Sequence, residues 1–207
     1  MASQPERVLF VEGQDDKHVI RHIRGRHGDL ADFEIRETGG IDSLLDAIEP
    51  AIKAAGRQSV GFLVDANSSF DDRWRSLVDR LRQLGIEPPQ ILEDDGCIIP
   101  GHPGRPRLGL WLMPDNRNSG ELEDFVQTLI PADDPVWPLA TKYIGEIPPE
   151  HRQFSENKVP RAQIHAWLAA RKEPRQMGAA IGTGELTANG ELAVRLVAWL
   201  RNLFGRQ

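Results

Sequence analysis

Two hydrophobic periods alternate along the first 130 residues of the chain. Short apolar runs, typical of buried strands, are followed by longer stretches with an apolar residue every three or four positions, typical of helices. The expected strands cover residues 7–12, 32–37, 60–65 and 108–113, and the expected helices cover residues 15–25, 41–55, 71–84 and 120–129. Strands that alternate with helices of this length predict an α/β fold, with a mostly parallel sheet flanked by helices on both faces.

Two further regions complete the pattern. Prolines and glycines interrupt residues 87–107, which predicts a hairpin or extended loop with one short strand at 97–99. Beyond residue 131 the pattern predicts three helices, at 135–144, 160–170 and 190–204, joined by proline-rich turns. We therefore expect an α/β domain over residues 1–130 and a C-terminal helical extension over 131–207 that packs on the same domain as a cap.

Composition narrows the class of protein. A chain of 207 residues with 40% hydrophobic content can fill one core. No apolar run is long enough for a membrane helix and the first residues lack the layout of a signal peptide, so we expect a cytoplasmic protein without a membrane partner. The single cysteine, Cys97, excludes an internal disulfide and a cysteine-rich zinc site. The net charge of −6 does not indicate a nonspecific grip on nucleic acid, although acids that bind a metal would inflate this count.

Acidic residues follow three of the predicted strands. Glu12 ends the first strand, Asp65 ends the third, and Asp115 follows the last. Open α/β sheets bind their ligands at the carboxyl ends of parallel strands, so we expect these carboxylates to meet at one edge. An acid that ends an apolar strand is better explained by chemistry than by a role at the start of the next helix.

Further acids lie close to these strand ends. Asp16 follows Glu12 by four residues, and Glu121 and Glu123 open the helix after the last strand. All three also lie where a helix N-terminus favours negative charge, so a purely structural role is the alternative for each. The alternative for Asp115 is that it opens a turn.

Converging carboxylates indicate a metal site. They repel one another unless a cation neutralises them, and hard oxygen ligands suit Mg²⁺ or Mn²⁺. The expected ligands are Glu12, Asp16, Asp65, Asn67, Asp115, Glu121 and Glu123. Such a metal would polarise a phosphodiester and activate a water molecule. Lys158 and Lys17 are candidates for a basic group that offsets charge in the transition state, although a lysine such as Lys158 is more often a solvated surface residue.

The histidines and tryptophans are better explained by structure than by chemistry. His18 and His22 have helical i, i+4 spacing, but the glutamate of a His-Glu-x-x-His zinc site is absent, so we expect them on a helix surface. The five tryptophans are expected to pack in the core and cap.

The acidic motifs carry a family resemblance. Val11-Glu12-Gly13 with an acid four residues after the glutamate, a strand ending in Asp65-Ala66-Asn67, and the segment Ser119-Gly120-Glu121-Leu122-Glu123 resemble the Toprim domain of primases, topoisomerases and nucleases. The chain is most similar to Toprim-like bacterial proteins of unassigned function that are related to the nucleases of the overcoming-lysogenization-defect family. The match covers residues 8–129.

The resemblance implies a compact Toprim-type sheet and Mg²⁺-dependent cutting or nicking of nucleic acid. Glu12 and Asp16 would correspond to the first acidic motif, Asp65 to the first acid of the usual Asp-x-Asp, and Glu121 or Glu123 to the acid of the third motif. It also implies nucleic acid as the substrate, with DNA favoured over RNA, and a separate ATPase partner in a bacterial anti-phage defence system.

One departure from the family pattern leaves the function open. Asn67 replaces the second acid of Asp-x-Asp, which removes a negative charge and places full two-metal catalysis in question. The chain has no phosphate-binding loop for ATP and its only tyrosine, Tyr143, lies outside the matched region, so an ATPase or topoisomerase is disfavoured. The leading hypothesis is a nuclease with Glu12, Asp65, Glu123 and Lys158 as catalytic residues. The alternatives are a catalytically degenerate Toprim-like module that binds a partner or nucleic acid, and a phosphatase or phosphodiesterase that acts on small molecules.

Overall fold

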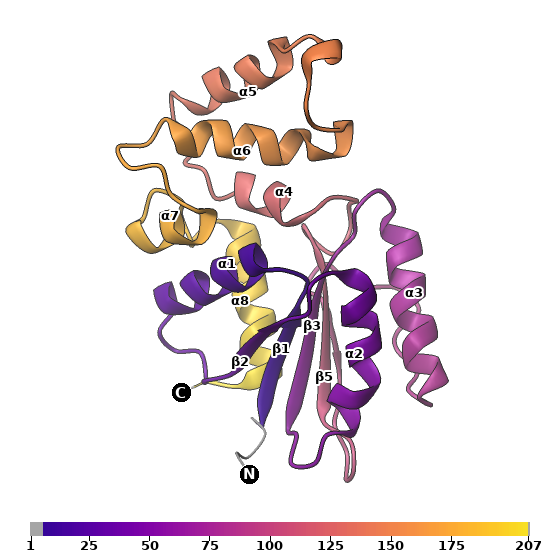
Figure 1. Cartoon of the computed structure of the whole chain (residues 1–207). Helices are drawn as coiled ribbons and strands as arrows, with labels where there is room; N and C mark the ends of the chain where they lie inside the picture. The colour runs from indigo at the N-terminus through magenta and orange to yellow at the C-terminus, as the bar shows by residue number, and fades with distance from the viewer. Residues whose placement is uncertain (1–5, 207) are drawn as a thin grey trace.

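A five-stranded sheet forms the centre of the protein (Figure 1). The computed structural model describes residues 6–206. The strands are β1 (Arg7–Val11), β2 (Glu34–Glu37), β3 (Ser59–Asp65), β4 (Cys97–Ile99) and β5 (Arg107–Met113). They lie in the order β2-β1-β3-β5-β4, and only β4 runs antiparallel, as a hairpin with β5. The predicted α/β fold with a mostly parallel, helix-flanked sheet is confirmed, and so is the hairpin.

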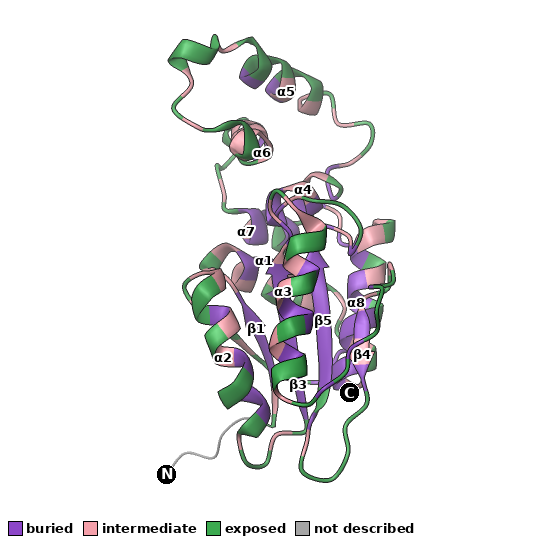
Figure 2. Cartoon of the chain, turned by 90° about the vertical axis from the view of Figure 1, so that its right-hand side faces the viewer, coloured by how far each residue is buried: buried purple, intermediate pink, exposed green. Residues whose placement is uncertain are grey.

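Helices cover both faces of this sheet (Figure 1). On one face, α2 (Ile41–Lys53) and α3 (Phe70–Gln83) enclose a core with the side chains of β1, β3 and β5. On the other face lie α1 (Gln14–Arg26) and α8 (Glu191–Phe204). Strands β1, β3 and β5 are almost continuously buried (Figure 2), which explains why they appear in the sequence as apolar runs.

The strand order places a topological switch point between β1 and β3. From β1 the chain crosses by α1 to β2 on one side, and then returns by α2 to β3 on the other side. Because α1 and α2 lie on opposite faces, the loops that follow β1 and β3 diverge and leave a crevice at the carboxyl ends of these two strands. Glu12 and Asp65 lie at this crevice.

Helix α8 lies close against the sheet because two glycines leave room for it. A Cβ atom at Gly61 would lie 2.8 Å from a methyl carbon of Leu203, and one at Gly109 would lie 2.6 Å from the same side chain. We expected the last helix to join the other C-terminal helices in a cap, but it forms a layer on the face of the sheet instead. The hydrophobic pattern predicted a helix there and gave no information about its partner.

The remaining helices lie at the carboxyl end of the sheet (Figure 1). Helix α4 (Leu122–Gln127) follows β5, and α6 (Val159–Ala169) packs against both α4 and α5 (Trp137–Glu146). Two short 3₁₀ helices, Pro149–His151 and Glu156–Lys158, connect α5 to α6. Most of the tryptophans are buried in these packed layers, as expected, and Trp111, Trp167 and Trp199 are the largest fully buried side chains.

One helix was not predicted from the sequence. Helix α7 (Met177–Thr183) packs along α1, and its two glycines allow the close approach. A Cβ atom at Gly178 would lie 2.7 Å from the backbone carbonyl of His18, and one at Gly182 would lie 2.5 Å from Nδ1 of His22. His18 and His22 lie on the surface of α1 and stay partly exposed, as expected, but α7 covers part of both.

Two further observations concern the length of the helices and the single cysteine. Within residues 6–206, no helix combines the length and the apolar composition that crossing a bilayer requires. The thiol of Cys97 is buried, and this burial raises its pKa to about 11, which makes it unreactive at neutral pH.

Candidate active site

The two strands at the switch point are joined by a side chain. Glu12 directly follows β1, and its Oε1 accepts a hydrogen bond from the backbone N–H of Asp65 at 2.9 Å. Asp65 in turn accepts a hydrogen bond through Oδ1 from the N–H of Leu122 at 3.0 Å. These bonds connect the end of β1, the end of β3 and the start of α4, so the carboxylates of Glu12 and Asp65 lie at one edge, as the sequence predicted.

The loop after β3 positions the third acidic segment. The backbones of Asn67 and Gly120 exchange hydrogen bonds at 2.7 and 2.8 Å. Gly120 has a positive φ of 145°, and a Cβ atom there would lie 2.8 Å from an oxygen of Asp124, so glycine is required at this position. Asp124 closes the start of α4 by accepting the N–H of Glu121 at 2.8 Å. This arrangement places Glu121 and Glu123 beside Asp65.

Asp16 joins the same group from the first turn of α1. It is 6% exposed, and its Oδ2 accepts the N–H of Gly13 at 3.0 Å. Its other oxygen, Oδ1, is buried and has no hydrogen-bond partner among residues 6–206. A buried carboxylate oxygen without a partner is costly, and here other carboxylates surround it rather than cations.

Burial and mutual repulsion raise the pKa of these carboxyl groups. Burial raises the pKa of Asp16 to about 7, and repulsion from Glu12 and Glu123 adds to this effect. The pKa of Asp65 lies well above its ordinary value because of burial and the negative charges of Asp16 and Glu12. Burial likewise raises the pKa of Glu12 and of Glu123. Several acids that are difficult to ionise in one crevice are a common feature of functional sites.

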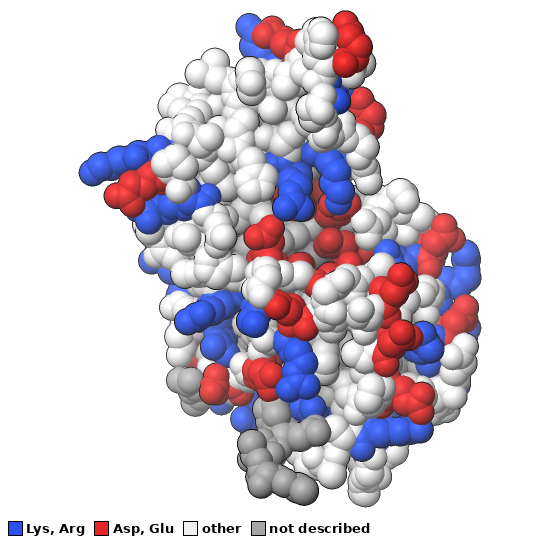
Figure 3. All heavy atoms as spheres, in the orientation of Figure 1, with Lys and Arg blue, Asp and Glu red and all other residues white. Residues whose placement is uncertain are grey.

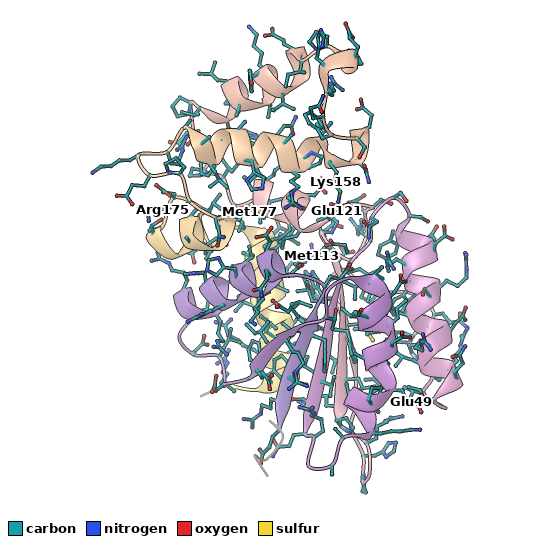
Figure 4. The ribbon with its side chains drawn as sticks, viewed as in Figure 1. Glu49, Met113, Glu121, Lys158, Arg175 and Met177 are labelled. Atoms are coloured by element: carbon teal, nitrogen blue, oxygen red, sulfur yellow. The ribbon has the colours of Figure 1, made fainter. Side chains whose placement is uncertain are left out.

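Basic residues face this group from the helical layer above it. Lys158, at the end of the second 3₁₀ helix, donates to both carboxylate oxygens of Glu121 at 2.8 and 2.6 Å (Figure 4). Arg161, in the first turn of α6, lies 3.5 Å from Glu123 and 3.5 Å from Asp15. Figure 3 shows acidic atoms in a hollow between the helical layer and the sheet, with basic side chains at its upper rim.

Sequence reasoning missed two of these basic residues. Arg161 follows Lys158 by three residues at the start of a helix, a spacing that could have indicated a shared face. Arg73 of α3 donates from Nε to the backbone carbonyl of Asp65 at 2.9 Å, and its charge opposes the rise in the pKa of Glu12. No local signal in the sequence connects Arg73 to this site, because the contact depends on how α3 packs.

Of three other candidate residues, Asp115 and Lys17 lie apart from the carboxylates and Asn67 lies beside them. The carboxylate of Asp115 accepts hydrogen bonds within its own turn, from the N–H groups of Arg117 at 3.1 Å and Asn118 at 2.8 Å, so the structure does not bring it into the group. Lys17 lies 3.8 Å from Glu37 instead. With its amide turned by 180°, Asn67 donates to Glu121 at 3.0 Å and accepts from Arg73 at 3.0 Å, which places it beside the carboxylates.

The donor set can be tested against a divalent cation. Carboxylate oxygens from several elements, one of them unpartnered, are chemically suited to Mg²⁺ or Mn²⁺. Within the described part of the chain, no three His, Cys, Asp or Glu side chains already stand as a group that could hold a metal ion. Glu121 is paired with Lys158 and Asp65 accepts a backbone N–H, so these two carboxylates would have to share or exchange those partners to bind an ion.

The fold and the site together define an α/β protein with a carboxylate group at the switch point of its sheet. A family model described as "Protein of unknown function (DUF3226)" matches residues 6–205, so the chain belongs to this family. No curated protein and no solved structure matches the chain.

Proposed function

We propose that this protein is a Mg²⁺- or Mn²⁺-dependent nuclease that hydrolyses or nicks nucleic acid. The observation that carries the proposal is the meeting of Glu12, Asp16, Asp65 and Glu123 at one sheet edge, with an unpartnered oxygen on Asp16 and a raised pKa on each carboxyl group. Four acids that repel one another in a buried crevice destabilise the empty protein. Such a cost is expected where a cation binds.

The residues of the chain have distinct proposed roles. Glu12, Asp16, Asp65 and Glu123 would hold the ion, which when bound polarises a phosphodiester and lowers the pKa of a water molecule. Lys158 and Arg161 place positive charge above the carboxylates, where a phosphate group of the substrate would lie. Arg73 and Asn67 fix the loop that follows Asp65.

The resemblance to Toprim domains supports the same conclusion. By this resemblance Glu12, Asp16, Asp65 and Glu121 or Glu123 would correspond to the acidic Toprim motifs. From this resemblance we infer DNA as the favoured substrate and a separate ATPase as a partner, in a bacterial anti-phage defence system. A single buried cysteine fits a reducing compartment, so we infer that the protein works in the cytoplasm.

A second candidate function is a binding module that has lost catalysis. Asn67 lacks the charge of the usual second acid, and Lys158 already neutralises Glu121. Such a module would bind nucleic acid or a partner protein through the same edge without cutting. The presence or absence of metal-dependent cleavage separates the two functions.

The test is cleavage of supercoiled plasmid by the purified protein with Mg²⁺ or Mn²⁺. A nuclease converts supercoiled DNA to nicked or linear forms, and the conversion stops with EDTA and in the Asp65→Asn variant. Absence of cleavage with either metal, also with an ATPase partner present, would support the binding module.

A further inference from the structure

A cavity lies at the edge of the sheet opposite to the candidate active site, where the strands begin. It has a volume of about 500 Å³. Ser59 begins β3 at this edge and Asp65 ends the same strand at the carboxylate site. Six residue steps of a strand span about 20 Å, so the cavity is separate from the candidate active site.

A row of three residues in register forms the floor of this cavity. Arg7 pairs with Ser59, and Ser59 pairs with Arg107, at the first positions of β1, β3 and β5. Residues paired in register project to the same face of a sheet. This is the face that packs on α8, and Leu203 and Phe204 form the apolar wall of the cavity. The side chains of Arg7 and Arg107 therefore begin on either side of Ser59, and Nη1 of Arg107 donates to the backbone carbonyl of Asn202 at 2.9 Å.

The hairpin between β4 and β5 contributes further basic groups. His102 and Arg105 exchange backbone hydrogen bonds at 3.1 and 2.9 Å across a tight turn, so their side chains lie next to each other. Both line the cavity, and so does Arg57, which lies two residues before β3. Four arginines and one histidine from four separate segments thus face one volume.

This cavity differs in charge from another cavity of similar size. The lining residues within the described chain include no aspartate or glutamate. A cavity of about 490 Å³ beside α3 contains Arg75 and Arg80, but Asp72 and Asp79 line it as well. The charges that line the cavity beside α3 are balanced, whereas those that line the cavity at the start of the strands are not. A net positive cavity with low-dielectric walls attracts anions.

Unsatisfied polar atoms in this cavity point to a missing ligand. Ser59 is 4% exposed, and its hydroxyl has no hydrogen-bond partner among residues 6–206. The Nε of Arg105 is also buried without a partner within this range. Buried polar groups in folded proteins are nearly always hydrogen-bonded, so an acceptor that fits between them is expected.

We propose that this cavity binds a small anion that carries a phosphate group. Arginine forks match phosphate oxygens with paired hydrogen bonds, and the serine hydroxyl supplies a further donor. The volume suits a small molecule, whereas a grip on a nucleic-acid backbone would require an extended basic stripe. The site does not depend on the proposed nuclease function, since none of its residues belongs to the carboxylate group.

Titration calorimetry with inorganic phosphate and with pyrophosphate tests the proposal. The titrations contain no divalent metal, and sodium chloride at matched ionic strength is the blank. We expect saturable binding of at least one of these anions at one site per chain. Equal affinities would identify a free phosphate ion as the ligand, and tighter binding of pyrophosphate would identify a polyphosphate chain.

Variants assign the binding to this cavity. The side chain of Arg7 makes no hydrogen bond or ion pair with another residue between 6 and 206, so Arg7→Gln should leave the fold intact and weaken binding about tenfold. Ser59→Ala should also weaken binding, because it removes a donor that has no structural partner. Arg80→Gln, which makes the same charge change in the balanced cavity, is the control and should bind like the wild type.

Three outcomes of the direct binding measurements would overturn the proposal. They are the absence of saturable binding of both anions, equal loss of binding in Arg7→Gln and Arg80→Gln, and unchanged binding in both Arg7→Gln and Ser59→Ala. A competition experiment provides a further test. If a single-stranded oligonucleotide displaces bound pyrophosphate at a lower concentration than phosphate does, the proposal is overturned, because this edge would then be a nucleic-acid site.

Discussion

The carboxylate of Glu12 accepts the backbone N–H of Asp65 at 2.9 Å, although 52 residues separate the two in the sequence. This bond joins the ends of β1 and β3 where the direction of strand addition reverses. It leaves the second oxygen of Glu12 and the side chain of Asp65 at the same crevice. The same hydrogen bond thus joins two strands of the sheet and positions two carboxylates of the candidate active site.

Asp65→Asn and Glu12→Gln should each abolish nicking while the protein stays folded. Each change keeps the side-chain shape but removes a charged oxygen ligand, so we expect a loss in rate of about a hundredfold or more. The measurement is the initial rate of plasmid nicking with Mn²⁺, with circular dichroism as the check on folding. Asp115→Asn is the control, because that carboxylate is satisfied within its own turn. Equal activity of Asp65→Asn and Asp115→Asn would contradict the assignment.

The stability of the metal-free protein should fall as the pH rises from about 4 to about 7. Asp16 has a pKa of about 7 in the folded protein and an ordinary value of 3.8, so within this window the folded state holds a proton that the unfolded state has lost. Above pH 7 the folded protein carries the full cost of a buried charge. The neighbouring carboxyl groups with raised pKa act in the same direction.

Asp16→Asn should remove part of this dependence. We expect the variant to be more stable than the wild type at pH 8 by about 1–2 kcal/mol and to differ little at pH 4, because a neutral amide avoids the buried charge. Urea denaturation in EDTA at both pH values measures the effect. A wild-type protein that becomes more stable between pH 4 and 7 would show that the carboxylates are compensated in some other way.

Lys158→Gln should reduce turnover without weakening metal binding. Lys158 occupies both oxygens of Glu121, so its removal frees a ligand while it takes away a positive charge near the substrate phosphate. We expect the nicking rate to fall about ten- to a hundredfold and Mn²⁺ affinity to stay equal or rise. Lys142→Gln, on the exposed pair of Lys142 with Glu146 in α5, should leave both unchanged. A loss of Mn²⁺ affinity in Lys158→Gln would indicate that this lysine is purely structural.

Gly178→Ala should destabilise the packing of α7 on α1. The added carbon would lie 2.7 Å from the backbone of His18, which cannot move away as a side-chain end can. We expect a loss of about 1–3 kcal/mol in the free energy of unfolding. Gly145→Ala is the matched control, since its added carbon meets no atom within 4 Å and alanine favours the helix. A melting temperature that is equal for the two variants would show that the close approach of α7 does not matter.

The sequence predicted the strands, most of the helices and the edge at which the acids meet, because all three follow from hydrophobic period and parallel strand direction. Helix α7 was missed because its segment contains mainly small residues, and Gly178 and Gly182 act through close packing that no period records. The position of α8 on the sheet depends on Gly61 and Gly109 in distant strands.

Within the site, prediction from the sequence is limited for the same reason, because close packing between distant segments leaves no local pattern. Glu12 and Asp65 could be paired from the rule that ligands bind at strand ends, since each belongs to a predicted strand. Arg73 could not be placed there, because its approach depends on how α3 docks, which the sequence does not specify. Arg161 could be linked by spacing only to Lys158, and its approach to Glu123 depends on how α6 docks. Asp115 was grouped with the other acids because it also follows a strand, but its turn folds the carboxylate back on its own backbone.

Titration calorimetry of Mn²⁺ into the metal-free protein tests the central claim most directly. If the carboxylates of Glu12, Asp16, Asp65 and Glu123 form a cation site, the wild type takes up Mn²⁺ in a saturable way, Mg²⁺ competes with it, and Asp65→Asn binds at least about tenfold more weakly. Asp115→Asn binds like the wild type. No uptake of Mn²⁺ by the wild type, or uptake that Asp65→Asn leaves unchanged, would contradict the claim.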